Sequence, residues 1–245
     1  MRRVLFVVLC VLLMGGEATP QSKQREAVVV YPPLYRASLV QAAPGRLTDL
    51  ISAYKQHFAA TGETPLWMRH SQGDRWDLLI LEPMVSYTAY YAPDRWDARK
   101  RQDAGWEQRR KPMVAWEEDV FVYGPAEADL KKAFSESGFF HVEMFRALAG
   151  KRAELLRERE MENAYSKAIG QPENFIFVRD MGASWDVFTI GCFRDIKHYA
   201  SSADVPPEKT QAAAKTAGFD SPAAIGPYLR QFIADHHDTL AVAIK

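Results

Sequence analysis

The chain has 245 residues, of which 47% are hydrophobic, and its 31 basic and 31 acidic side chains balance to a formal net charge of zero. A neutral chain has no overall field to attract nucleic acid or an anionic membrane surface, so neither partner is expected. Two cysteines, Cys10 and Cys192, exclude a fold held by several disulfides, and the length suffices for two lobes of about 100 residues that each bury a core.

The first residues are predicted to form an export signal. Arg2–Arg3 precedes an apolar run of eleven residues, 4–14, and the small residues Gly16 and Ala18 suit cleavage after position 18. Eleven helical residues reach roughly 17 Å, well short of a ~30 Å hydrocarbon core. We therefore predict a signal peptide over 1–18 and a periplasmic or secreted protein without membrane attachment after cleavage.

Residues 28–124 are predicted to form a first lobe. Helices are assigned where apolar side chains recur at helical spacing, and strands where short apolar runs flank turn residues. In chain order, the predicted elements are strand 35–43, a helix from Arg46 that ends before Gly62, hairpin strands 66–70 and 76–81, a polar helical stretch to residue 111 and strand 113–123.

Residues 137–245 are predicted to repeat this order, after a short helical connector over 124–136. The predicted elements are strand 139–148, helix 151–170, hairpin strands 175–179 and 185–190, helical pieces 195–217 and 221–237, and a short strand 241–244. Each lobe thus has the order β-α-β-β-α-β, which is the ferredoxin-like unit.

A short motif marks the equivalent hairpin of each lobe. Gly73 precedes Trp76–Asp77 by three positions, and Gly182 precedes Trp185–Asp186 by the same spacing. A repeat of this length indicates a duplicated domain, because each copy is large enough to bury its own core. The sequence therefore predicts an α+β fold of two tandem ferredoxin-like units.

Two fused units with this element order and this repeated Gly-x-x-Trp-Asp motif resemble the dimeric α/β-barrel superfamily. The resemblance implies that the two sheets pack together as a pseudo-dimer within one chain, and it leaves a homodimer of the chain open. In pattern the chain is similar to the NIPSNAP-like and EthD-like groups. The superfamily also holds antibiotic-monooxygenase-like proteins and the haem-binding chlorite-dismutase group, so the fold alone implies no single activity.

The repeated Trp-Asp pairs are interpreted mainly as structural. A pair present in both copies is explained by a shared fold, with each Trp packed under the helix and each Asp holding a turn or pairing with Arg69 or Arg179. The functional alternative is that Trp185 and Asp186 bind a ligand, with the Asp as a base or orienting group. In an oxygenase or haem enzyme, Arg179 would steady an anionic intermediate.

Ionisable residues present in only one copy are the candidates for chemistry. His141 and Glu143 are two residues apart on a predicted strand, so their side chains share one face. They form a candidate acid–base pair. His236 and His237 are expected at the end of the last helix, where either could bind a ligand or act as a base. The predicted catalytic residues are His141, Glu143, His237 and Arg179, the predicted ligand-binding residues are Trp185, Asp186 and His236, and no metal site is predicted.

Aromatic and basic side chains alternate over residues 87–111. Tyr87, Trp96 and Arg99 are examples, and such groups suit an aromatic or anionic small molecule or a protein partner. The alternative is an amphipathic helix with an aromatic inner face and a charged outer face.

The leading functional hypothesis is a protein that binds a small apolar or aromatic molecule, or a degenerate enzyme, with its pocket between the sheet and helices of one lobe. The alternatives are a cofactor-independent oxygenase or haem enzyme, with His141 or His237 as base or axial ligand, and a structural or interaction module. The chain lacks phosphate-loop, nucleophile-elbow and zinc-protease motifs, and its cofactor is left open.

Overall fold

The computed structural model describes residues 32–244, with the backbone but not the side chains of 98–104. The predicted signal peptide lies outside the described residues. The elements are β1 (Leu34–Ala42), α1 (Leu47–Thr61), β2 (Leu66–Gln72), β3 (Leu78–Pro83), α2 (Tyr87–Tyr90), α3 (Pro93–Arg110), η1 (Lys111–Met113), β4 (Val114–Tyr123), α4 (Glu127–Glu136), β5 (Phe139–Ala147), α5 (Arg152–Ile169), β6 (Phe175–Met181), β7 (Val187–Phe193), α6 (Ile196–Ala200), η2 (Ser201–Asp204), α7 (Pro207–Ala217), η3 (Pro222–Ala224), α8 (Ile225–Leu229) and β8 (Ile233–Ala243).

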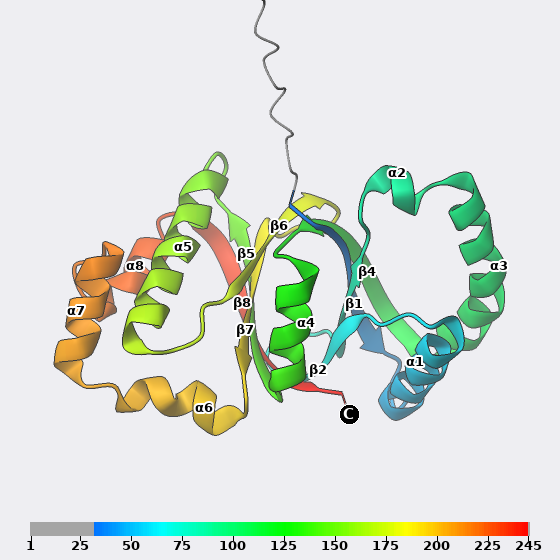
Figure 1. The fold of residues 1–245 in the computed structure, drawn as a ribbon, viewed down its shortest axis with the longest axis horizontal. Helices are drawn as coiled ribbons and strands as arrows, with labels where there is room; N and C mark the ends of the chain where they lie inside the picture. The colour runs from blue at the N-terminus through cyan, green and yellow to red at the C-terminus, as the bar shows by residue number, and fades with distance from the viewer. Residues whose placement is uncertain (1–31, 245) are drawn as a thin grey trace, which may run out of the picture. The chain divides into compact units, whose positions relative to one another are not determined.

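The eight strands close into one antiparallel barrel in the order β1-β3-β2-β8-β5-β7-β6-β4. The first half, defined here as β1–β4 with α1–α3, has the order β4-β1-β3-β2. The second half, β5–β8 with α5–α8, has the matching order β8-β5-β7-β6. The halves join where β2 pairs with β8 and where β4 pairs with β6. Helices of the two halves lie on opposite sides of the barrel (Figure 1).

The central strands β1 and β5 correspond residue by residue. Both have nine residues, and their burial differs only at the eighth position. This alignment makes Arg36 equivalent to His141, Ser38 to Glu143 and Leu39 to Met144. Successive side chains of a strand point to opposite faces. The first two pairs therefore lie on the outer face of the barrel, and the third pair, Leu39 and Met144, lies inside it.

The two motif glycines allow each hairpin turn to press against the other half of the barrel. Gly73 has φ 125°, and a Cβ there would lie 2.2 Å from the carbonyl oxygen of Asp238 on β8. Gly182 has φ 87°, and a Cβ there would lie 2.8 Å from the carbonyl oxygen of Asp119 on β4. Any other residue would clash with backbone at both turns, which explains why the motif contains glycine.

The barrel interior forms the largest core cluster, and α4 closes one end of it. Leu130 of α4 is fully buried in this cluster, and the rings of Phe134 and Phe140 lie 4.8 Å apart. Trp76 and Trp185 belong to the same interior cluster. The prediction that they pack under the helices is therefore wrong, because both residues precede their strands and turn into the open end of the barrel.

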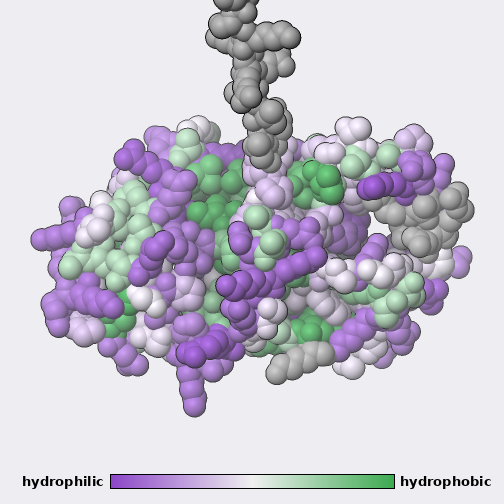
Figure 2. Space-filling model, in the orientation of Figure 1, coloured by the Kyte–Doolittle hydropathy of each residue, from purple (hydrophilic) through white to green (hydrophobic). Residues whose placement is uncertain are grey.

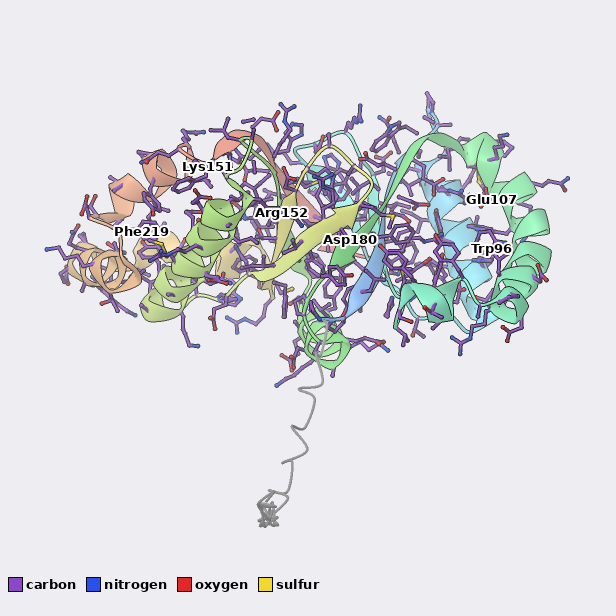
Figure 3. All side chains as sticks on the ribbon, turned by 90° about the horizontal axis from the view of Figure 1, so that it is seen from above. Trp96, Glu107, Lys151, Arg152, Asp180 and Phe219 are labelled. Carbon is purple, nitrogen blue, oxygen red and sulfur yellow. The ribbon has the colours of Figure 1, made fainter. Side chains whose placement is uncertain are left out.

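Separate cores lie under the helices on the outer faces of the sheet. In the first half Leu50 and Tyr54 of α1 and Trp106 of α3 pack on β1 and β3, and His57 stacks on Trp106 at 4.3 Å. In the second half the outer core includes Leu155. Trp96 and Phe219 mark the opposite helical sides in Figure 3.

The helices of the described residues expose a mostly hydrophilic surface. Figure 2 shows hydrophilic side chains over much of the face that carries α4, with hydrophobic residues visible between them. Among the described residues, no helix combines the length and apolar character that a membrane crossing requires.

Residues 221–237 do not form the predicted helix. This stretch contains only the short η3 and α8, and β8 begins at Ile233 and runs to Ala243. Pairing with β5 over nine positions outweighs the helical propensity of the alanine-rich sequence. His236 and His237 consequently lie on a strand and point to opposite faces, instead of lying at a helix end.

Candidate functional site

A cavity of about 310 Å³ lies at the end of the barrel away from α4. Its wall includes Leu39 and Met144, which lie toward the ends of β1 and β5 that are distant from α4. Trp76 and Trp185 line it from the two hairpins. Two pairs of equivalent residues from both halves therefore build much of the apolar part of this cavity, which lies inside the barrel and not between sheet and helices.

The polar part of the cavity wall differs between the halves. Leu39 pairs with Glu118 on β4, and Met144 pairs with His237 on β8. Glu118 and His237 thus occupy equivalent positions, and both line the cavity. One half contributes a carboxylate where the other contributes an imidazole.

Charged groups surround the opening of the cavity. The guanidinium of Arg75 lies 4.1 Å from the ring centre of Trp116, a cation–π contact. His237 Nδ1 lies 3.1 Å from Asp74 Oδ2, and Arg146 pairs with Asp235. The Asp74 contact can fix the orientation of the His237 ring, which acid–base chemistry requires.

Burial in the cavity wall affects one carboxyl group and two indole N–H groups. Desolvation raises the pKa of Glu118, with Arg75 opposing the shift and Asp74 adding to it. The indole N–H groups of Trp76 and Trp185 are buried without a hydrogen-bond acceptor. The two Trp rings therefore contribute apolar surface at the cost of two unsatisfied donors.

A second group of ionisable residues lies on the outer face of β5 and β8. His141 and Glu143 share this face of β5, and Asp238 lies opposite Glu143 on β8. One donor atom from each of the three lies within 4.8 Å of the others. Asp238 contacts His141 Nε2 at 3.4 Å and His236 Nε2 at 3.2 Å, so the carboxylate bridges two imidazoles.

Helix α5 covers this face and adds one buried arginine with two carboxylates. Arg159 is 2% exposed and lies 2.6 Å from Glu158 and 2.5 Å from Glu162. Its distance to Glu143 is longer, 3.4 Å. Glu143 also accepts a hydrogen bond from Thr189 Oγ1 at 2.9 Å.

The pKa shifts in this second group reflect its excess of carboxylates. Burial lowers the pKa of His141, but the hydrogen bond to Asp238 and the charges of Glu143 and Glu162 outweigh it, so the pKa is raised. The same hydrogen bond lowers the pKa of Asp238. Desolvation, opposed by Arg159 and reinforced by Glu143 and Glu158, raises the pKa of Glu162 to about 7.

The predicted site residues lie in three places, namely the cavity, the outer face of β5 and β8, and the hairpin of the second half. Trp185 and His237 line the cavity, whereas His141, Glu143 and His236 gather around Asp238 on the outer face. The two histidines predicted as neighbours at one site are thus on opposite faces of the sheet.

Arg179 and Asp186 form an ion pair at the hairpin. Arg179 Nη2 lies 2.5 Å from Asp186 Oδ1, and Asp186 Oδ2 accepts the backbone N–H of Ala147 at 2.9 Å. In the first half Asp77 accepts the N–H of Ala42 at 2.7 Å in the same way. These contacts fit the structural interpretation of the two Trp-Asp pairs.

Sequence reasoning missed Asp74, Arg75 and Asp238. Asp238 directly follows the helix predicted over 221–237, whereas on the strand β8 it shares a face with His236. Asp74 and Arg75 lie in a hairpin turn. Only the sheet order shows that this turn reaches β8 of the other half.

The equivalent outer face of the first half has a different charge pattern. Arg36 lies 2.8 Å from Glu82 and 3.9 Å from Asp119, which accepts a hydrogen bond from Ser38. Beside it, Tyr87 packs against Phe121 at 5.4 Å. The aromatic side chains of the 87–111 segment with described contacts thus pack largely on one another and on the sheet.

No family model and no curated protein matches the sequence. Solved structures do match. An anthrone oxidase-like protein has a TM-score of 0.60 at 9% identity, with 89% of this chain and 93% of that chain covered. A monooxygenase candidate from Fusobacterium nucleatum subsp. nucleatum has a TM-score of 0.53 at 11% identity, with 88% and 94% covered. At these identities the likeness concerns the fold, and the chain has the fold of the dimeric α/β-barrel proteins, closed within one polypeptide.

Proposed function

We propose that this protein binds a small aromatic molecule in the cavity at the open end of the barrel. The observation that carries the proposal is the cavity itself, which three tryptophans, Trp76, Trp116 and Trp185, line together with six ionisable side chains around its opening. Aromatic walls combined with polar groups that orient the ligand are typical of small-molecule sites. The volume lies at the lower end of their usual range of about 300–1000 Å³, which favours a ligand of one or two rings.

Titration with 1-naphthol, followed by saturation-transfer NMR and calorimetry, tests this proposal. We expect micromolar binding of 1-naphthol and much weaker binding of its saturated counterpart, decahydronaphthol. Ser184 is an exposed residue of the cavity wall, so Ser184→Trp should fill the cavity and abolish binding. Ser135→Trp, at an exposed position on α4, is the matched control and should bind normally. Unchanged binding by Ser184→Trp would refute the location.

Haem, an alternative that the resemblance to the superfamily left open, does not fit His141 or His237. His141 Nε2 is directed to Asp238 at 3.4 Å, and its ring packs 5.4 Å from Tyr199. The side chain of His237 is 57% exposed at the rim of a cavity too small to enclose a porphyrin. We expect protein produced with haem available to show no Soret band.

A second candidate function is a cofactor-independent oxygenase that uses the same cavity. The His237–Asp74 contact favours it, because a carboxylate that orients an imidazole prepares it to act as a base. With anthrone as the probe, His237 would remove an acidic ring proton, and O₂ would then oxidise the anion to anthraquinone with release of water.

Oxygen uptake with anthrone tests this second function. We expect His237→Ala and Asp74→Asn each to lower the rate at least tenfold, whereas His198→Ala, on α6 and outside the cavity wall, should not. Absence of uptake by the wild type, together with retained binding of 1-naphthol, would leave a binding protein without this activity.

Three further features belong to the proposal. We infer that the halves arose by tandem duplication of a ferredoxin-like unit, as their matching strand orders support. We propose export with cleavage after Ala18, which N-terminal sequencing of protein from its host would test. A homodimer, which sedimentation would detect, is compatible with the fold.

A further inference from the structure

We propose that the outer face of β5 and β8 binds a divalent metal ion through His141, Glu143 and Asp238. One donor atom from each residue lies within 4.8 Å of the other two. Ligands held about 2.1 Å from one ion lie roughly 3–4 Å apart, so small side-chain rotations would bring all three onto the ion. The 3.4 Å between His141 Nε2 and Asp238 Oδ1 already has this spacing. The site does not depend on the cavity proposed above.

The backbone explains why these donors meet. His141 and Glu143 are two residues apart on β5 and therefore share a face. Asp238 is directly opposite Glu143 in the antiparallel pair with β8. Three donors on two paired strands are held by the sheet and need no loop to position them. One imidazole and two carboxylates suit Zn²⁺, Mn²⁺ or Fe²⁺ better than Ca²⁺ or Mg²⁺, which take mainly oxygen ligands.

The charge balance of the buried cluster favours a cation. Three carboxylates, Glu143, Glu158 and Glu162, lie around Arg159, and Glu158 and Glu162 are the closest at 2.6 and 2.5 Å. Glu143 lies 3.4 Å from Arg159 and otherwise accepts hydrogen bonds from Thr189 and Asn174, so among the described residues it has no close ion pair. Glu158 is fully buried, and its Oε1 atom has no hydrogen-bond partner. Buried carboxylates in excess of their partners are costly, and a divalent ion beside Glu143 would offset this cost.

The first half shows what the same position looks like when a fixed cation is present. Arg36 takes the place of His141 and pairs with Glu82 at 2.8 Å, and Ser38 takes the place of Glu143. The carboxylate at the position of Asp238 is Asp119, which lies 3.9 Å from Arg36. The second half therefore has a metal-binding imidazole where the first has a permanent positive charge.

Neighbouring groups hold the proposed ligands in place. Thr189 donates a hydrogen bond to Glu143 Oε2 at 2.9 Å, and His236 Nε2 lies 3.2 Å from Asp238 Oδ2. His236 in turn stacks on Phe145, with ring centres 5.8 Å apart. Such outer contacts orient metal ligands and are a usual part of metal sites. The Asp238 side chain is 53% exposed, which leaves a route for an ion from solvent.

Metal titration of the full chain after chelator treatment and dialysis tests the proposal. We expect Zn²⁺, Mn²⁺ or Co²⁺ to bind with one ion per chain and a micromolar or lower Kd by calorimetry. His141→Ala and Asp238→Asn should each weaken binding at least tenfold. Asp119→Asn, at the equivalent position of the first half, is the matched control and should bind like the wild type.

A second measurement keeps the test decisive if a variant fails to fold. Substoichiometric Mn²⁺ should broaden the imidazole NMR signals of His141 and His236 in the wild-type protein and leave that of His57, in the outer core of the first half, sharp. Absence of one-to-one binding, equal broadening of His57 and His141, or unchanged affinity in a folded Asp238→Asn variant would each overturn the proposal. The cluster would then be a network of carboxylates and histidines that hydrogen bonds and ion pairs hold together without a metal ion.

Discussion

The two halves of the barrel share a framework and differ in chemistry. Trp76 and Trp185 line one cavity, and Asp77 and Asp186 accept equivalent backbone N–H groups of Ala42 and Ala147. In contrast, other equivalent positions hold unlike polar groups, namely Arg36 and His141, Ser38 and Glu143, and Glu118 and His237. The Trp-Asp positions that maintain the barrel hold the same residue type in both halves, whereas these positions on the outer face of the sheet and in the cavity wall hold different ones.

The strongest test of this shared framework is removal of the two buried indoles. Trp76→Ala and Trp185→Ala should each lower the free energy of unfolding by about 3–5 kcal/mol, because each leaves a large void in the barrel interior. Urea unfolding would measure both, and Trp96→Ala on α3, a residue outside the barrel that is 37% exposed, is the control. A cost below 1 kcal/mol for either interior residue would contradict the equivalence.

A smaller difference is expected between the two aspartates. Asp77→Ala should cost about 1–3 kcal/mol, because the N–H of Ala42 would lose its acceptor. Asp186→Ala should cost more, since the partly buried Arg179 would also lose its partner. A double-mutant cycle with Arg179→Ala would isolate the ion pair. Equal costs for the two Asp→Ala variants would show that the pair adds nothing.

The smallest expected effect concerns Glu118, whose pKa burial raises. A carboxyl with a higher pKa in the folded state stabilises the fold when protonated, and this stabilisation is lost as the pH rises through that pKa. Glu118→Gln cannot ionise, so its stability relative to the wild type should improve by a few tenths of a kcal/mol from about pH 4 to pH 7, with solvent screening limiting the gain. Thermal unfolding at several pH values would measure this, with the exposed Glu136→Gln as control.

The sequence allowed the order of most elements to be predicted, because amphipathic periods and turn glycines are local signals. The exception was the stretch before β8, where Gly226 and Pro227 shorten the helix and pairing with β5 extends the strand. The interior position of Trp76 could not be predicted, because alternation along a strand does not indicate which face closes into a barrel.

The candidate sites were harder to predict than the fold. His141 and Glu143 were identified by their two-residue spacing, which is local. Their partner Asp238 and the pairing of His237 with Asp74 depend on contacts of β8 with β5 and with the hairpin after β2. Such contacts depend on tertiary structure, which propensity and periodicity do not describe.

The position of β8 has a consequence for how the chain folds. During synthesis every other strand leaves the ribosome before β8, yet β8 pairs with both β2 and β5. Until it is added, the barrel has two unpaired strand edges and its interior tryptophans are open to water. Such partly closed intermediates are prone to aggregation, so we expect closure of the barrel to be late and to limit the folding rate.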